Sequence, residues 1–384
     1  MYLPRIKELR RAYGFEEVAI VPGEVTINPE LANTTFSLGP HTFALPLIAS
    51  AMDGVVDPAM AVKMHEFGGL GVLNLEGVHG RYENPDDILE QISQATEDEI
   101  TPLFQKIYST PLKDQAIAAC IARIKDGGAV CAVSVTPQNT KRVAPIAVEA
   151  GADILVVQST VTTARHVSRS YKGLIFQELC EQISIPVVVG NSVGFNTALE
   201  LMETGISGLL VGVGPGAACT SREVLGIGVP QITATLECAA AREEYVRRTG
   251  RDVAIITDGG LRTGGDICKA IASGADAIML GTPLAQAYEA PGRGYNWGMA
   301  SPHPDLPRGT RIKVGTRGSL REILLGPSSV ADGTMNLVGA LRTAMGMCGA
   351  LTIKDMHQAE MIIAPAIKTE GKVFQMQQRV NSRN

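Results

Sequence analysis

Short apolar runs rich in β-branched residues recur along the chain, and most of them end in Gly, Asn, Ser or Asp. Continuous apolar strands of this kind suit a parallel sheet that is buried on both faces. A stretch with helical periodicity lies between most of the runs, so the chain consists of βα units in series. Eight such units predict an α/β fold, a (β/α)8 TIM barrel, and a doubly wound open sheet is the alternative. The expected strands are Pro46–Ser50, Leu70–Asn74, Val130–Val135, Asp153–Gln158, Pro186–Gly190, Gly208–Gly212, Val253–Asp258 and Asp276–Gly281.

Two intervals are longer than one βα unit. Arg81–Pro111, after the second strand, is acidic and helical in pattern and has no strand signal, so a separate domain is not expected there. After the eighth strand, Ala290–Arg321 is rich in Gly, Pro and Arg and has little periodicity, which is typical of a functional lid or a disordered segment. Asn336–Gly349 is expected to form the last barrel helix. We therefore predict one catalytic barrel domain over residues 1–384, with an active-site flap at 290–325 and no second domain.

Composition excludes several classes of function. The 34 Lys and Arg residues against 39 Asp and Glu give a net charge of −5, and aromatic residues make up only 4% of the chain. These values argue against a nucleic-acid partner or an anionic membrane surface. No charge-free apolar run is long enough to span a bilayer. The seven cysteines are scattered without a CxxC pair, so we expect reduced thiols and a cytoplasmic protein.

Glycine-rich loops follow the last two expected strands. Strand seven ends in DGGLRTGGD, from Asp258 to Asp266, and strand eight ends in Gly281-Thr282. Glycines let backbone N–H groups approach phosphate oxygens, and barrels commonly bind phosphate after strands seven and eight. The pattern predicts a phosphate site, with Asp258 placed to accept hydrogen bonds from ribose hydroxyls. Tight turns without a ligand are the alternative.

A third glycine-rich loop follows strand six and contains a thiol. It runs GVGPGAACTSR, from Gly212 to Arg222, with Cys219 just before an expected helix. The positive end of a helix favours a thiolate, so Cys219 is a candidate nucleophile. A cysteine in such a loop is, by itself, more often inert.

The motifs together resemble the IMP dehydrogenase/GMP reductase family. GVGPGAACTS followed by GIGVPQ is similar to the catalytic cysteine loop of that family, and DGGLRTGGDI…GADAIMLGTPLA to its phosphate-binding half. FEEVAIVPG, ASAMDGV, VVGN and GALRTAMG also match, in family order and across most of the chain. The resemblance is to a short branch, because the chain has no room for the CBS domains that long forms insert after strand two.

The resemblance implies roles for particular residues. Cys219 would attack C2 of a purine nucleoside monophosphate, and the Ser221 hydroxyl would lie beside it. From the Arg-rich composition of the flap, and not from the resemblance, we expect Arg308 to take part in hydrolysis with Ser221. NAD, or alternatively NADP, would contact Gln158 and Ser159, and K⁺ would bind the carbonyls of Gly214, Gly216 and Cys219. A homotetramer or octamer is implied as well. The residues expected to contact the nucleotide are Ser50, Met52, Asn191, Gly216, Asp258, Gly260, Gly281 and Thr282.

Some positions depart from the family pattern. Gln158 stands where the family has a cofactor-contacting aspartate, and Leu210 replaces an arginine. The flap lacks the Arg-Tyr pair linked to water activation in IMP dehydrogenases, and the glutamate that GMP reductases use has no clear match. We expect an IMP dehydrogenase. The alternatives are a GMP reductase, a flavin-dependent barrel oxidoreductase and a non-catalytic nucleotide-binding relative.

Overall fold

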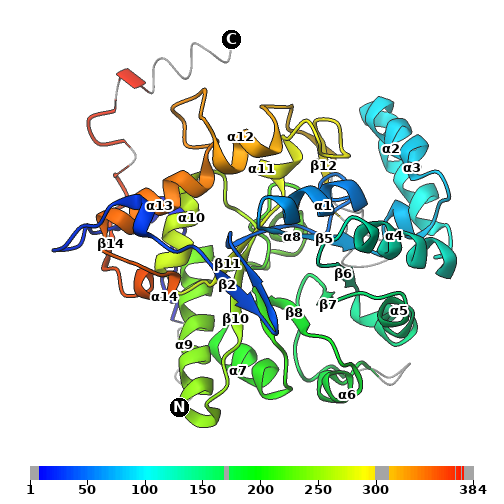
Figure 1. Cartoon of the computed structure of the whole chain (residues 1–384), viewed down its shortest axis with the longest axis horizontal. Helices are drawn as coiled ribbons and strands as arrows, with labels where there is room; N and C mark the ends of the chain where they lie inside the picture. Colours follow the sequence, from blue (N-terminus) through cyan, green and yellow to red (C-terminus); the bar gives the residue numbers. More distant parts are fainter. Residues whose placement is uncertain (1–7, 168–172, 299–310, 368, 373, 376–384) are drawn as a thin grey trace, which may run out of the picture.

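Eight parallel strands close into a barrel (Figure 1). The computed structural model describes residues 8–167, 173–298, 311–367, 369–372 and 374–375. Around the barrel the strands follow the order β10-β11-β4-β5-β6-β7-β8-β9. Each of them lies within or overlaps one of the eight runs named above, so the predicted (β/α)8 fold is confirmed. The barrel strands are β4 (Leu47–Ala49), β5 (Leu70–Asn74), β6 (Ala132–Val135), β7 (Ile154–Gln158), β8 (Val187–Ser192), β9 (Gly208–Val211), β10 (Ala254–Asp258) and β11 (Ala277–Leu280).

A helix follows each barrel strand, and after the first seven strands it returns the chain to the start of the next strand. The last of them, α13, begins after Asn336, whose Oδ1 accepts a hydrogen bond from the Gly339 N–H at 3.1 Å. This cap explains why the expected final helix starts where it does. The barrel helices are α1 (Pro58–Glu66), α4 (Asp114–Asp126), α5 (Pro137–Glu149), α6 (Phe176–Gln182), α7 (Phe195–Glu203), α9 (Gln231–Thr249), α10 (Gly264–Ala272) and α13 (Leu337–Met347).

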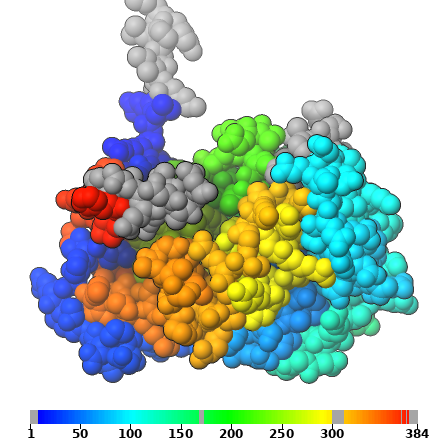
Figure 2. Space-filling view, turned by 90° about the horizontal axis from the view of Figure 1, so that it is seen from above, coloured from blue at the N-terminus to red at the C-terminus, as the bar shows by residue number. Residues whose placement is uncertain are grey.

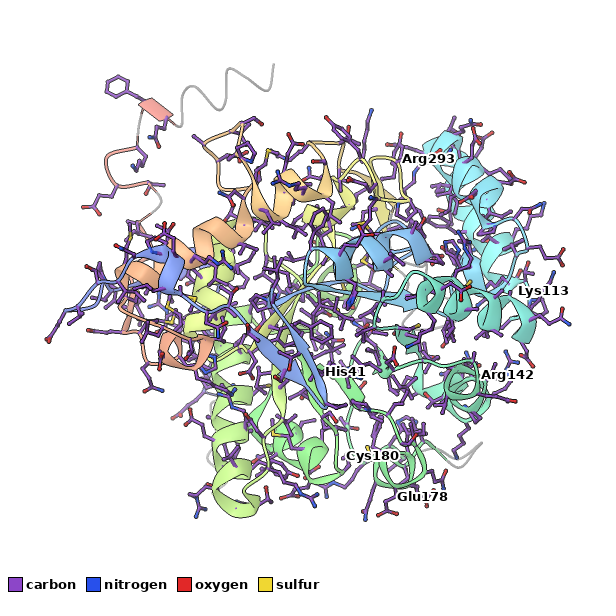
Figure 3. All side chains as sticks on the ribbon, in the orientation of Figure 1. His41, Lys113, Arg142, Glu178, Cys180 and Arg293 are labelled. Carbon is purple, nitrogen blue, oxygen red and sulfur yellow. The ribbon has the colours of Figure 1, made fainter. Side chains whose placement is uncertain are left out.

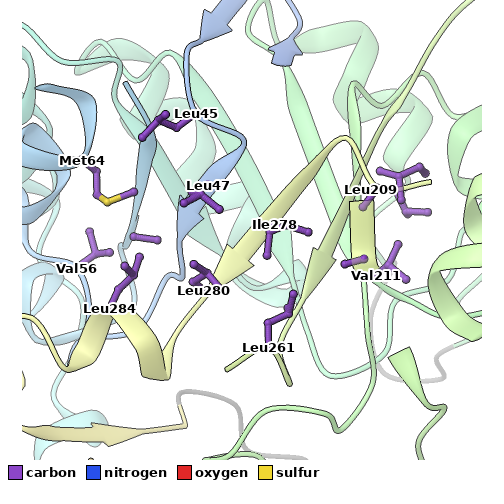
Figure 4. Packing of buried hydrophobic residues seen from close by; sticks show 14 of the residues in the cluster. Leu45, Leu47, Val56, Met64, Leu209, Val211, Leu261, Ile278, Leu280 and Leu284 are labelled. Atoms are coloured by element: carbon purple, nitrogen blue, oxygen red, sulfur yellow. The ribbon is translucent and has the colours of Figure 1, made fainter. Parts of the chain in front are cut away.

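The hydrophobic core has two layers. Side chains that point outward from the strands, such as Leu209 and Ile278, pack beneath the helices (Figure 4), whereas Leu210 and Met279 point into the barrel. A hairpin of β2 (Phe36–Leu38) and β3 (His41–Phe43) packs its apolar residues against the barrel interior. The interior is therefore filled, and the carboxyl ends of the strands remain as the face on which a site can be built.

Two additions surround that face. The expected acidic helical interval forms α2 (Pro85–Gln94) and α3 (Glu97–Ser109), which lie side by side at one edge of the molecule (Figure 1). In the expected flap, β12 (Tyr295–Trp297) pairs antiparallel with β13 (Arg311–Lys313), and α12 (Leu320–Leu325) follows. The flap shows no strand pattern in its sequence, because each of these strands has only 3 residues, too few for an alternation of apolar and polar side chains to stand out.

The remaining elements are short. β1 (Val18–Ile20) and β14 (Met361–Ile363) pair antiparallel and join the two ends of the chain. Within the described residues, no helix combines the length and the apolar character needed to cross a membrane. The other short elements are η1 (Phe15–Glu17), η2 (Pro29–Leu31), η3 (Val78–Gly80), α8 (Ser221–Leu225), α11 (Thr282–Ala285) and α14 (Ile353–Met356).

Candidate active site

Many of the residues predicted to form the nucleotide and cofactor site lie at the carboxyl ends of the barrel strands. Ser50 follows β4, Gln158 ends β7, Asn191 is the residue before the end of β8, Asp258 ends β10 and Gly281 follows β11. Because all the strands are parallel, these positions face the same end of the barrel. Residues separated by more than two hundred positions in sequence are thus gathered around one mouth.

Three of these side chains form one hydrogen-bonded group. Asp258 Oδ2 accepts from Asn191 Nδ2 at 2.8 Å and from Gln158 Nε2 at 3.0 Å. Gln158 Nε2 also lies 3.1 Å from Asn191 Oδ1. Both amides are bound to the same carboxylate oxygen, so the other oxygen, Oδ1, is oriented by them and left for a ligand hydroxyl.

The environment of Asp258 changes its acidity. Burial raises the pKa of its carboxyl to about 6, although the hydrogen bonds from Asn191 and Gln158 act in the opposite direction. A carboxylate in that range responds to small changes in its surroundings near neutral pH. The two amides are therefore the groups that keep Asp258 ionised and able to accept hydrogen bonds.

The thiol of Cys219 is exposed, on the loop between β9 and α8. Its Sγ lies 3.4 Å from Oγ of the buried Ser221, and its backbone N–H donates to the Gly216 carbonyl at 3.0 Å. Burial raises the pKa of each of the other six thiols, which makes them poor nucleophiles. They are Cys120, Cys131, Cys180, Cys238, Cys268 and Cys348.

The cysteine loop packs directly against the loop after β10, which is the first of the two loops expected to bind phosphate. Gly259 and Gly260 have φ values of +85° and +79°, a region that favours glycine. A Cβ on Gly260 would lie 3.0 Å from Cβ of Pro215, and one on Gly259 would lie 3.3 Å from the nitrogen of Gly216. These glycines therefore allow the loop that carries Cys219 to approach the loop that is expected to bind phosphate.

Gln231 was not singled out from the sequence, and it holds the two loops in place. It is buried at the start of α9, and its Nε2 lies 3.0 Å from the Val211 carbonyl and 2.7 Å from the Asp258 carbonyl. It thereby links the ends of β9 and β10. The signal was present in the motif GIGVPQ, of which Gln231 is the last residue, but a helix-starting glutamine has no distinctive pattern of its own.

The second loop expected to bind phosphate, which follows β11, has a neighbour that was not predicted from the sequence. A Cβ on Gly281 would lie 3.2 Å from Met52 Sδ and 3.7 Å from both Ser50 Oγ and Asn296 Nδ2. Asn296, in β12, is buried, and its Nδ2 lies 3.4 Å from Oγ1 of Thr282. Four predicted nucleotide contacts and one unpredicted amide donor therefore surround the same small space.

The residues expected to bind the cofactor and the cation have the following hydrogen bonds. The Gln158 amide nitrogen is used on Asp258 and Asn191, so its oxygen is the group left to accept a cofactor hydroxyl. Ser159 Oγ donates to the Val161 carbonyl at 2.9 Å.

A carbonyl oxygen has two lone pairs, so the bond from Cys219 to Gly216 leaves that carbonyl able to bind K⁺. The described residues contain no cluster of His, Cys, Asp and Glu able to hold a metal. Arg308 lies outside them.

Comparison with known proteins gives a consistent result. The family model described as IMP dehydrogenase / GMP reductase domain matches residues 12–300. An uncharacterized oxidoreductase of Mycolicibacterium smegmatis is 40% identical over 92% of this chain and 97% of its own length. The inosine-5′-monophosphate dehydrogenase of Cryptosporidium parvum is 29% identical over 95% of this chain and 94% of its own length. The crystal structure of an IMP dehydrogenase/GMP reductase-like protein from Corynebacterium glutamicum superposes with a TM-score of 0.88 at 35% identity, covering 94% of this chain and 97% of that one.

Proposed function

The chain belongs to the IMP dehydrogenase/GMP reductase family of oxidoreductases, and on that premise we propose that it oxidises IMP to XMP with NAD⁺. The observation that carries the proposal is the placement of Cys219. Its exposed thiol lies on the loop that packs against Gly259 and Gly260, at the mouth that also holds Asp258. The likeness to named IMP dehydrogenases favours IMP over GMP as the substrate.

The nucleotide would be held at three points. Asp258 Oδ1 would accept from the ribose hydroxyls, while Asn191 and Gln158 hold Oδ2. Backbone N–H groups at Gly260, Gly281 and Thr282, with the Ser50 hydroxyl, would bind the phosphate, and Gly216 would flank it from the cysteine loop. Met52 would then lie against the base. This arrangement presents C2 of the purine to Cys219.

Catalysis begins with Cys219. The thiolate sulfur adds to C2 of IMP, and the adduct gives up the C2 hydrogen as hydride, with its electron pair, which leaves a thioimidate on Cys219. NAD⁺, which Gln158 and Ser159 would hold, would supply the hydride acceptor. Water then adds to C2, the carbon–sulfur bond breaks, and the thiol regains a proton. The balance is IMP, NAD⁺ and water to XMP, NADH and one proton.

Hydrolysis requires a group that takes a proton from water. The Ser221 hydroxyl lies close to the Cys219 sulfur, but a serine hydroxyl is a weak base without help. We propose that Arg308 in the flap assists Ser221: Arg308 would orient the attacking water and exclude bulk solvent. The carbonyls of Gly214, Gly216 and Cys219 would bind K⁺ and stabilise the loop, and we expect a cytoplasmic homotetramer or octamer.

A pair of assays tests the proposal. The purified protein is incubated with IMP and NAD⁺ and, separately, with GMP and NADPH, while absorbance in the nicotinamide band is recorded. We expect absorbance to rise in the first mixture and to stay constant in the second. A fall in the second mixture, with no change in the first, would assign the chain to GMP reduction. Cys180→Ala serves as a thiol control, because Cys180 lies in α6, outside the barrel, and its Cβ packs beside Gly205, which precedes β9.

A further inference from the structure

The insertion of α2 and α3 has a small hydrophobic core of its own, and the only tryptophan of the chain belongs to it. Trp297, at the end of β12, is 1% exposed and packs with Phe104 at 5.8 Å between ring centroids. Tyr108 lies in the same core. The segment that leaves the second phosphate loop is thus built into the insertion rather than resting on the barrel alone.

A buried chain of hydrogen bonds continues from this core to the nucleotide site. Trp297 Nε1 donates to Tyr108 Oη at 2.8 Å, and Tyr108 Oη donates to Asp53 Oδ2 at 2.9 Å. Asp53 is the residue after Met52, which lies against Gly281. Tyr108 is therefore the bridge between the loop after β4 and the strand β12.

Two arginines fasten the strands β12 and β13 to α2. The Arg311 guanidinium donates to the carbonyls of Ile92 and Ala95 at the end of that helix and lies 4.4 Å above the Tyr295 ring. Arg293 is 3.6 Å from Glu90 and projects beside α2 (Figure 3). In the space-filling view the insertion adjoins the segment around residue 290 along one edge of the molecule (Figure 2).

The side chains of Asn296 and Trp297 lie on opposite faces of β12, because successive side chains in a strand point in opposite directions. Trp297 enters the insertion core, so Asn296 faces the barrel mouth. Asn296 Oδ1 accepts from the Trp297 backbone N–H at 2.9 Å, which directs Nδ2, a donor, toward Gly281 and Thr282. A donor is the kind of group that a phosphate oxygen binds.

We propose that the α2–α3 insertion is a support for the phosphate site, in which Tyr108 and Trp297 are positioning residues that aim the Asn296 amide at the nucleotide phosphate. The proposal rests on the proposed nucleotide site. It gives the insertion a task within this chain: the hydrogen bonds of Tyr108 fix Trp297, and Trp297 fixes the residue before it.

The test compares two tyrosines of the insertion. Tyr108→Phe removes the bridging hydroxyl and keeps the ring. Tyr82→Phe is the matched control, since the Tyr82 hydroxyl contacts only Ile107 and Thr110 among the bonds described and does not reach β12. Dissociation constants for IMP and for inosine are measured by calorimetry. We expect Tyr108→Phe to lower the preference for IMP over inosine by about threefold to tenfold, the worth of one hydrogen bond, and Tyr82→Phe to leave it unchanged.

A double-mutant cycle separates positioning from general loosening. Asn296→Ala should lower the same preference by about tenfold or more, because a donor to a charged phosphate is lost. Tyr108→Phe should then cause no additional loss in the Asn296→Ala background. If Tyr108→Phe does not fold, as judged by Trp297 emission and thermal unfolding, Trp297→Phe removes the Nε1 donor and is measured in its place.

Three results would overturn the proposal: equal effects of Tyr108→Phe and Tyr82→Phe, additive losses in the cycle, or an unchanged preference for IMP in Asn296→Ala. A protein that binds inosine as tightly as IMP before any substitution would overturn the nucleotide site and this proposal together. Failure to form NADH, with the preference for IMP and its dependence on Tyr108 intact, would count against the proposed reaction alone.

Discussion

Replacing Gln158 with leucine should move the pH dependence of nucleotide binding. The change removes the Nε2 donor, 3.0 Å from Asp258 Oδ2, and leaves Asn191 as the other amide donor. A hydrogen bond to a charged group contributes about 1.5–3 kcal/mol, and one pKa unit corresponds to about 1.4 kcal/mol. The Asp258 pKa, already raised by burial to about 6, should therefore rise by about one to two further units in the variant.

The direction of the change in affinity with pH follows from the role of the Asp258 carboxylate. Asp258 must be ionised to accept hydrogen bonds from ribose, so affinity increases as pH rises through its pKa and levels off above it. In the unaltered protein the midpoint of the rise should lie near pH 6, so that affinity is close to its plateau at pH 7. In Gln158→Leu the rise should continue through neutral pH, which makes the variant bind IMP more weakly at pH 7 but almost equally well at pH 9.

Dissociation constants for IMP between pH 5 and 9 measure this directly. The IMP phosphate also titrates near pH 6, but it does so identically with both proteins, so the difference between the two profiles isolates Asp258. Gln177→Leu is the control, because Gln177 donates to the Glu181 carboxylate at 3.0 Å on the exposed face of α6. Superimposable profiles for Gln158→Leu and the unaltered protein, or a limb displaced to lower pH, would refute the reasoning.

Three further predictions concern other parts of the molecule. Iodoacetamide at neutral pH should alkylate Cys219 first, with protection by IMP, since burial raises the pKa of the other thiols; peptide mass spectrometry would contradict this if Cys180 or Cys348 reacted first. Arg242→Met should lower the free energy of unfolding by about 2 kcal/mol in urea titrations, because it removes the buried 2.8 Å partner of Asp276 Oδ2 and leaves the more exposed Lys354 on Oδ1, whereas the exposed Arg247→Met should cost under about 1 kcal/mol. Arg308→Ala should slow hydrolysis more than hydride transfer, seen as a pre-steady-state burst of NADH; equal losses in both steps would remove Arg308 from the mechanism.

The barrel was predictable because its signals are local. Each strand is a continuous apolar run, and the helix start at Asn336 has a capping residue. The glycine loops at Gly260 and Gly281 were likewise visible, because the positive φ of Gly260 and the close approach of the Met52 side chain to Gly281 both favour a residue without a Cβ.

The support around the site was not predictable in the same way. Trp297 and Tyr108 are 189 positions apart, and neither the acidic helices nor the Gly-rich segment shows that they share a core. Gln158 was expected to contact a cofactor, and the hydrogen bond that its amide nitrogen donates to Asp258 was not foreseen. Contacts between distant side chains depend on the closed fold, which periodicity in a single segment does not encode.

The covalent bond between Cys219 and the purine is the central claim, and trapping it is the most direct test. The protein is mixed with IMP and NAD⁺, quenched in acid during steady turnover and digested for mass spectrometry. We predict that the peptide containing Cys219 carries the mass of the purine nucleotide thioimidate and that Cys219→Ala binds IMP but forms neither adduct nor NADH. NADH formation by Cys219→Ala at a rate near that of the unaltered protein would contradict the account.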